Sequence, residues 1–174
     1  LAARTAAEIE AAAEAIRQSG GQAQALVLDV LDAEAVAAAI AGAGPFEILV
    51  NNAGTNRPKP MQEVTTADYD AVLDLNVKSA FFVAQAVARG LIAAGRPGSL
   101  IHVGSQMGHV GGPNRALYCA SKWALEGMSK AFALDLAAHQ IRSNTLAPTF
   151  IETPMTQPFF ADRAFLDSVL AKIK

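Results

Sequence analysis

A serine, a tyrosine and a lysine in the second half of the sequence have the types and the spacing for proton-transfer chemistry. Ser105 ends an apolar run, a glycine-rich loop follows, and Tyr118 and Lys122 then stand four residues apart. Residues four apart on a helix share one face, so a phenol and an ammonium would project together. The reference pKa of tyrosine is about 10, and a nearby ammonium lowers it toward neutrality, as a general acid/base requires. Together with a Ser105 hydroxyl that hydrogen-bonds a carbonyl oxygen, these groups suit reversible carbonyl reduction by a bound cofactor that supplies the hydride.

Apolar runs that alternate with helical segments form the frame for these residues. We expect strands at 24–30, 46–51, 99–103 and 141–146, and helices at 4–18, 33–41, 66–94, 117–138 and from about 161 onward. This alternation predicts an α/β fold with a parallel sheet that helices cover on both faces. No internal repeat or linker interrupts the pattern, so residues 1–174 are expected to form a single domain. In such sheets ligands bind beyond the carboxyl ends of the strands.

Composition excludes several classes of protein. Of the 174 residues 52% are hydrophobic and 17% charged, which predicts extensive burial or subunit contacts. The net charge of -2 argues against a nucleic-acid partner. The single cysteine, Cys119, excludes an internal disulfide and fits a reducing compartment. We find no run of about 18 apolar residues that could span a bilayer and no charged-then-apolar leader before the first helix, and we therefore expect a soluble, cytoplasmic protein without a membrane partner.

Further motifs at the expected strand ends make the pattern more specific. In chain order the motifs are Asn51-Asn-Ala-Gly54, the asparagine of Leu73-Asp-Leu-Asn-Val77, Ser105, Tyr118-Cys-Ala-Ser-Lys122, Asn144, and Ala147-Pro-Thr-Phe-Ile-Glu-Thr153. As a set in this order they resemble the motifs of the short-chain dehydrogenase/reductase family, from end to end of the chain. The resemblance implies a Rossmann-like doubly wound parallel sheet, with strands 3–6 of the family fold present, and an oxidoreductase of the EC 1.1.1 type.

The resemblance also implies a catalytic group of four residues. Tyr118 would be the general acid/base, and Lys122 would lower its pKa and hold the nicotinamide ribose. Ser105 would orient the carbonyl, and Asn76 would anchor a water in a proton relay to Lys122. From the residues alone Asn76 is the least obvious of the four, because an asparagine inside an apolar helix usually marks a mildly unfavourable site or a local bend.

A nicotinamide cofactor would contact residues at the same strand ends, and no metal site is expected. The positions that the resemblance implies, besides Tyr118 and Lys122, are Arg4, Asp29, Val30, Asn52, Ala53, Gly54, Pro148, Ile151 and Thr153. The Arg4 guanidinium can bind a 2′-phosphate with two hydrogen bonds. Preference for NAD usually comes with an acidic residue at this turn, and none lies between Leu1 and Ala7, so NADP is favoured over NAD. Thr149 departs from the family, which usually has glycine after this proline.

Three parts of the family fold are not found within these 174 residues. They are the glycine-rich phosphate loop with its first strand, most of the second strand, and the seventh strand. In the family order 3-2-1-4-5-6-7, this separates the strand at 24–30 from the strand at 46–51. We therefore expect a fragment of a longer polypeptide, with an open gap in its sheet and exposed apolar edges. A molecule that ended at both points is expected to bind cofactor poorly and to have little activity.

Polar residues near the expected pocket favour a small hydroxylated or anionic keto substrate, such as a sugar acid or a polyol. They are Asn56, Arg57, Gln106, His109, Asn114 and Arg115. A 3-oxoacyl thioester is the alternative substrate, and a non-catalytic fragment that acts only in assembly is the alternative function. The helices at 66–94 and 117–138 carry apolar residues on several faces, which predicts a homodimer or homotetramer. His102, inside a strand, is interpreted as a satisfied core histidine.

Overall fold

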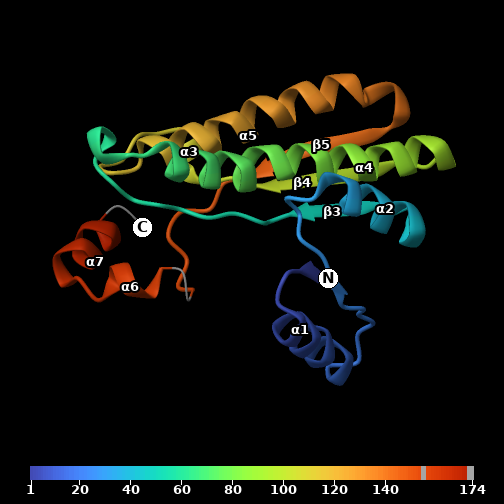
Figure 1. Cartoon of the computed structure of the whole chain (residues 1–174), viewed down its shortest axis with the longest axis horizontal. Helices are drawn as coiled ribbons and strands as arrows, with labels where there is room; N and C mark the ends of the chain where they lie inside the picture. Colours follow the sequence, from blue (N-terminus) through green and yellow to red (C-terminus); the bar gives the residue numbers. More distant parts are fainter. Residues whose placement is uncertain (154–155, 172–174) are drawn as a thin grey trace.

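A computed structural model of the chain describes residues 1–153 and 156–171. Its strands are β1 (Ala2–Ala3), β2 (Leu26–Val27), β3 (Ile48–Asn51), β4 (Gly98–Val103) and β5 (Ile141–Leu146). Its helices are α1 (Ala6–Gln18), α2 (Ala33–Ala43), α3 (Thr66–Leu73), α4 (Ser79–Ala94), α5 (Ala116–Asp135), α6 (Gln157–Phe160) and α7 (Arg163–Leu170). Helices alternate with strands through most of the chain, as the sequence predicts (Figure 1).

The strands form two separate parallel sheets, one of three strands and one of two. The larger sheet has the order β3-β4-β5, and β1 pairs with β2 in the smaller one. In the larger sheet Ile48 lies opposite Ser99 and Gly98 lies opposite Ile141. The gap expected between the strands at 24–30 and 46–51 is therefore present. The first of these is shorter than predicted, because β1 offers β2 only two residues to pair with.

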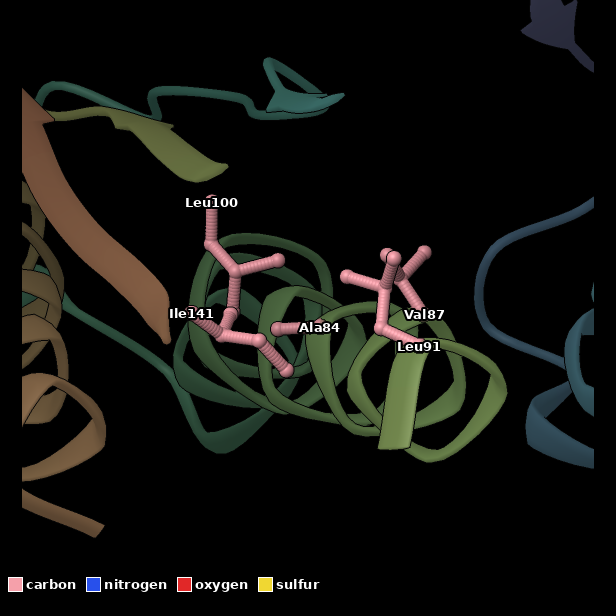
Figure 2. Packing of buried hydrophobic residues seen from close by; sticks show 5 residues of the cluster. All are labelled: Ala84, Val87, Leu91, Leu100 and Ile141. Atoms are coloured by element: carbon pink, nitrogen blue, oxygen red, sulfur yellow. The ribbon is translucent and has the colours of Figure 1, made fainter. Parts of the chain in front are cut away.

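Helices α2, α4 and α5 cover one face of the larger sheet, whereas α1 packs against the smaller sheet (Figure 1). The core between α4 and the larger sheet consists of buried Ala84, Val87, Leu91, Leu100 and Ile141. Figure 2 shows the α4 members of this cluster together with Leu100 of β4 and Ile141 of β5. On β3, Leu49 packs against the cluster, but Ile48 and Val50 point the other way and are 66% and 59% exposed. Apolar side chains of β3 are therefore exposed on the sheet face that α4 does not cover.

The segment Thr66–Ala94 forms one long helix with a change of winding in its middle. At its first turn Thr65 Oγ1 accepts a hydrogen bond from the Asp68 backbone nitrogen, and Asp68 Oδ2 accepts one from the Thr65 backbone nitrogen, which together form a capping box. A π-helical turn, Asp74–Lys78, joins α3 to α4. We expected no segment that could span a bilayer, but by length and composition alone this helix could, with a mean hydropathy of 1.3 over 18 residues. Its apolar character has a local cause, because residues of α4 supply most of the core on the larger sheet.

Candidate active site

The carboxyl ends of the parallel strands bring the chemically distinctive residues to one edge of the larger sheet. β3 ends at Asn51, and β4 runs directly into Ser105. β5 leads into the loop that contains Pro148. The backbone nitrogen of Gln106 donates a hydrogen bond to the Pro148 oxygen at 2.9 Å, which ties the loops after β4 and β5 together.

The π-helical turn holds Asn76 completely buried at this edge. Asn76 Nδ2 donates to the backbone oxygen of Thr55 at 2.9 Å and to Ser121 Oγ at 3.0 Å. Asn76 Oδ1 accepts from the backbone nitrogen of Thr55 at 2.7 Å. The amide thus joins the loop after β3 to α5, at the residue before Lys122. A π turn is a feature that is frequent at functional sites.

Ser105 and Tyr118 line the same pocket. Ser105 is buried, and its Oγ accepts a hydrogen bond from the backbone nitrogen of Met107 at 3.1 Å. The pocket is small, with a volume of about 90 Å³, and it opens to solvent. Its lining consists of Asn56, Ser105, Gln106, Met107, Arg115, Tyr118, Thr149, Phe150, Thr156 and Phe159.

Lys122 lies one helical turn beyond Tyr118 on α5, and it is buried. Its Nζ donates to the backbone oxygen of Val103 at 2.8 Å and stands 5.6 Å from the centre of the Tyr118 ring. Gly54 approaches the same place from the loop after β3. A Cβ atom on Gly54 would lie 3.3 Å from Asn76 Oδ1 and 3.8 Å from Lys122 Nζ. The backbone of Gly54 therefore passes beside two members of the predicted catalytic group.

Burial changes the proton affinities of both ionisable members of the group. It lowers the pKa of Lys122 from 10.5 to about 8. Burial raises the pKa of Tyr118, an effect that the Ser105 hydroxyl and the Arg115 charge oppose only in part. The sequence analysis expected Lys122 to lower the Tyr118 pKa. In the chain by itself burial outweighs any such effect, and the Lys122 amine is directed to the Val103 carbonyl.

The residues expected to contact a cofactor lie mostly at the surface. Arg4 follows β1 directly and is exposed. Of the others, Asp29, Asn52, Ala53 and Ile151 are exposed, whereas Val30, Gly54, Pro148 and Thr153 are half-buried. Arg4 and the residues at 29–30 follow the two strands of the smaller sheet, and the remaining ones follow β3 and β5. The positions expected at the adenosine end thus follow β1, β2 and β3, and those expected at the nicotinamide carboxamide follow β5.

Glu126 is a buried residue of the site that the sequence analysis missed. Its Oε2 accepts a hydrogen bond from Thr145 Oγ1 of β5 at 2.7 Å. Its Oε1 lies 3.3 Å from His109 Nε2. A Cβ on Gly104 would be 3.1 Å from Oε1, and one on Gly108 would be 3.1 Å from Glu126 Cγ. Glu126 thus packs under both ends of the loop that carries Ser105. Its spacing of four residues from Lys122 on one helix face was the available signal.

The polar residues expected at the pocket mouth divide into two groups. Asn56, Gln106 and Arg115 line the pocket. Of the others, Arg57 Nη1 instead contacts Asp68 Oδ1 at 3.1 Å. His109 is engaged by Glu126, and Asn114 is exposed in a loop with a positive φ of 58°.

His102 lies in the core, as expected, but its hydrogen-bonding groups are not satisfied. The side chain has no exposed surface, and its ring centre is 6.0 Å from that of Phe132. Neither ring nitrogen has a hydrogen-bond partner among residues 1–153 and 156–171. Burial lowers the pKa of His102, so the ring is held neutral. The prediction of a core histidine is confirmed, and the prediction of a satisfied one is wrong.

Comparison with known proteins identifies the family. The family model for short chain dehydrogenases matches residues 1–164. The chain belongs to the short-chain dehydrogenase family. L-xylulose reductase of Bos taurus is 39% identical over 150 residues, which cover 84% of this chain and 62% of that protein. Gluconate 5-dehydrogenase of Gluconobacter oxydans is 36% identical over 168 residues, which cover 94% of this chain and 65% of that protein.

The solved structures of this family agree with the fold. A gluconate 5-dehydrogenase from Burkholderia cenocepacia, crystallised with NADP and tartrate, superposes with a TM-score of 0.91 at 34% identity. The match covers 97% of this chain and 67% of that one. The Rossmann-like short-chain dehydrogenase fold predicted from the sequence is therefore confirmed, and the chain spans less than two thirds of the length of the two curated relatives described above.

Proposed function

We propose that the chain forms the catalytic part of an NADP-dependent oxidoreductase that interconverts a carbonyl compound and an alcohol. The observation that supports this most strongly is that the side chains of Ser105 and Tyr118 line one pocket while the Lys122 amine is buried beside the Tyr118 ring. The named activities of the relatives, L-xylulose reductase and gluconate 5-dehydrogenase, are of the same reaction type.

In this proposal each residue has a separate task. The Tyr118 hydroxyl gives its proton to the carbonyl oxygen during reduction and takes it back during oxidation. Ser105 donates a hydrogen bond to the same oxygen, where negative charge develops. The Lys122 ammonium stabilises the phenolate that Tyr118 leaves behind, and with a pKa of about 8 most of the lysine is protonated at neutral pH. Asn76 keeps α5 and the loop after β3 in register through its three hydrogen bonds.

The residues present suit the nicotinamide half of the cofactor. Gly54 leaves open the space that a side chain would fill beside Lys122 Nζ. Lys122 would hold the nicotinamide ribose, and Ile151 and Thr153, in the loop after Pro148, would meet the carboxamide. Asn52 and Ala53, which are exposed, would leave room with Gly54 for the adenosine ribose. When bound, NADPH supplies the hydride that reaches the carbonyl carbon.

Arg4 supports NADP rather than NAD as the cofactor. Its exposed guanidinium directly follows β1, where it can pair with a 2′-phosphate, and Asp29 and Val30 of the adjacent loop would approach the adenine. The solved gluconate 5-dehydrogenase of Burkholderia cenocepacia contains NADP. Faster turnover with NADH than with NADPH would overturn this assignment.

The substrate in this proposal is a small polar keto compound, of the sugar acid or polyol class. Asn56, Gln106 and Arg115 supply polar groups to the pocket wall. We further propose a cytoplasmic homodimer or homotetramer that associates through the surfaces of α4 and α5. Phe81, Phe82 and Trp123 support this, because they are 37%, 37% and 55% exposed on these helices.

Replacement of Tyr118 tests the proposal. In the natural polypeptide that carries this chain, Tyr118→Phe should lower kcat by about 1,000-fold, because it removes only the proton donor. Turnover is followed by NADPH absorbance with a panel of carbonyl compounds, and NADPH binding, measured by calorimetry, should be unchanged. Tyr69→Phe is the matched control, since Tyr69 is 54% exposed on α3. Turnover that survives in Tyr118→Phe would show the mechanism to be wrong.

A further inference from the structure

Within the described part of the chain ten residues line the pocket, and among these Arg115 alone is charged. It stands at the N-cap of α5, three residues before Tyr118, which places it one turn from the proposed proton donor. Within residues 1–153 and 156–171 its guanidinium takes part in no salt bridge, although ion pairs engage Arg57 nearby. A cation in this position gives the pocket a positive potential beside the reacting groups.

One contact and partial burial prepare the Arg115 side chain for a ligand. Its guanidinium carbon lies 5.0 Å from the centre of the Phe159 ring, a stacking contact that restrains the group. A guanidinium restrained through its face keeps the in-plane N–H groups that bind a carboxylate with two hydrogen bonds. Burial also lowers the pKa of Arg115, which shows that the charge is partly removed from water. An anion in the pocket would offset that loss of solvation.

Asn56 adds a second polar group with unused hydrogen-bonding capacity. It lines the same pocket, and its Oδ1 is buried without a hydrogen-bond partner among the residues that the structure describes. A buried amide oxygen without a partner is costly, and a substrate hydroxyl could supply the missing hydrogen bond. The pocket therefore combines a site for an anion with a site for a hydroxyl donor.

We propose that the substrate is a polyhydroxylated keto acid whose carboxylate binds Arg115 and whose hydroxyl donates to Asn56 Oδ1. This inference rests on the proposed function and selects the acid over the neutral polyol within it. Arg115 determines specificity here and does not take part in proton transfer.

The test compares two ketones that differ only in the group that Arg115 would bind. 5-Keto-D-gluconate carries a carboxylate where L-sorbose carries a hydroxymethyl group. With NADPH and the natural polypeptide, we expect a higher kcat/KM for the keto acid. Arg115→Met should lower the ratio of the two kcat/KM values by about 30- to 100-fold, the usual value of a charge-assisted pair. Arg115→Lys should restore part of the ratio.

Two further variants serve as controls. Arg142→Met removes an exposed arginine of β5 that does not line the pocket, and it should leave the ratio unchanged. Asn56→Ala should lower kcat/KM for both ketones by a similar factor, because both carry hydroxyl groups. Circular dichroism checks that each variant is folded.

The outcomes separate this inference from the proposed function. Equal kcat/KM for both ketones, or a ratio that Arg115→Met does not change, would overturn the assignment of Arg115 while leaving carbonyl reduction intact. Failure to reduce either ketone would also overturn the assignment, and the carbonyl panel with Tyr118→Phe would then decide whether the proposed function itself stands.

Discussion

Lys122→Met should stabilise the protein while removing its activity. Burial lowers the pKa of Lys122 from 10.5 to about 8, and one pKa unit corresponds to about 1.4 kcal/mol. Folding with the charged amine therefore costs roughly 3 kcal/mol at pH 7. Methionine fills similar space without a charge, but it gives up the hydrogen bond to the Val103 oxygen, which is worth about 1 kcal/mol. The expected net gain in the free energy of unfolding is about 2 kcal/mol.

The pH dependence of this gain has a defined sign. Below about pH 8 the lysine is protonated in both the folded and the unfolded protein, so the full cost of burying the charge is present. Between pH 8 and pH 10.5 the folded protein has lost this proton while the unfolded protein still binds it. Because the unfolded state binds more protons, the free energy of unfolding of the wild type rises with pH in this window. The advantage of Lys122→Met should therefore shrink across this window.

Urea denaturation without cofactor, at pH 7 and near pH 10, measures both effects. Lys130→Met is the matched control, because Lys130 is exposed on the same helix. Its free energy of unfolding should follow that of the wild type at both pH values. A Lys122→Met variant that is less stable than the wild type at pH 7, or whose advantage is the same at both pH values, would refute the reasoning.

Three further results are expected. Asn76→Ala should lower the free energy of unfolding by about 2–4 kcal/mol, because it leaves the backbone nitrogen and oxygen of Thr55 without their partner and removes the hydrogen bond that Ser121 Oγ accepts. A loss below about 1 kcal/mol in urea denaturation would contradict this. Glu126→Ala should cost about 1–3 kcal/mol by the same measurement, since a buried carboxylate that Thr145 anchors is removed. Sedimentation velocity should show a dimer or tetramer that Trp123→Glu weakens, and a wild-type monomer would argue against the proposed assembly.

The order of helices and strands could be predicted because it depends on local sequence patterns. Asp32 accepts hydrogen bonds from the first turn of α2, and the Thr65 and Asp68 pair forms the box at the start of α3, as their spacing indicates. The predicted strand at 141–146 matches β5 residue for residue. The strand at 24–30 was predicted too long, since its pairing depends on a distant partner, β1, which contributes two residues.

The residues of the site could be predicted from the sequence, but the effect of the fold on their pKa values could not. The spacing of Tyr118 and Lys122 indicates their shared helix face, but it does not reveal that burial raises the tyrosine pKa. That effect depends on the tertiary fold, which packs distant parts of the chain around Tyr118. The acceptor for the Lys122 amine, the Val103 oxygen, is likewise a product of the tertiary fold. Backbone groups carry no signature in the sequence that marks them as partners of a given side chain.

The π turn at Asp74–Lys78 has a consequence for how this helix can change. A π turn holds one more residue than an α-helical turn needs, and each residue in an α-helix adds about 100° of rotation. Deleting one residue within the turn would restore uniform winding, yet α3 would then be rotated against α4. Either Asn76 would turn away from Thr55, or the apolar side of α4 would leave the sheet. The π turn therefore sets the rotation of α3 relative to α4. Because of this offset, Asn76 can face Thr55 while the apolar side of α4 faces the sheet.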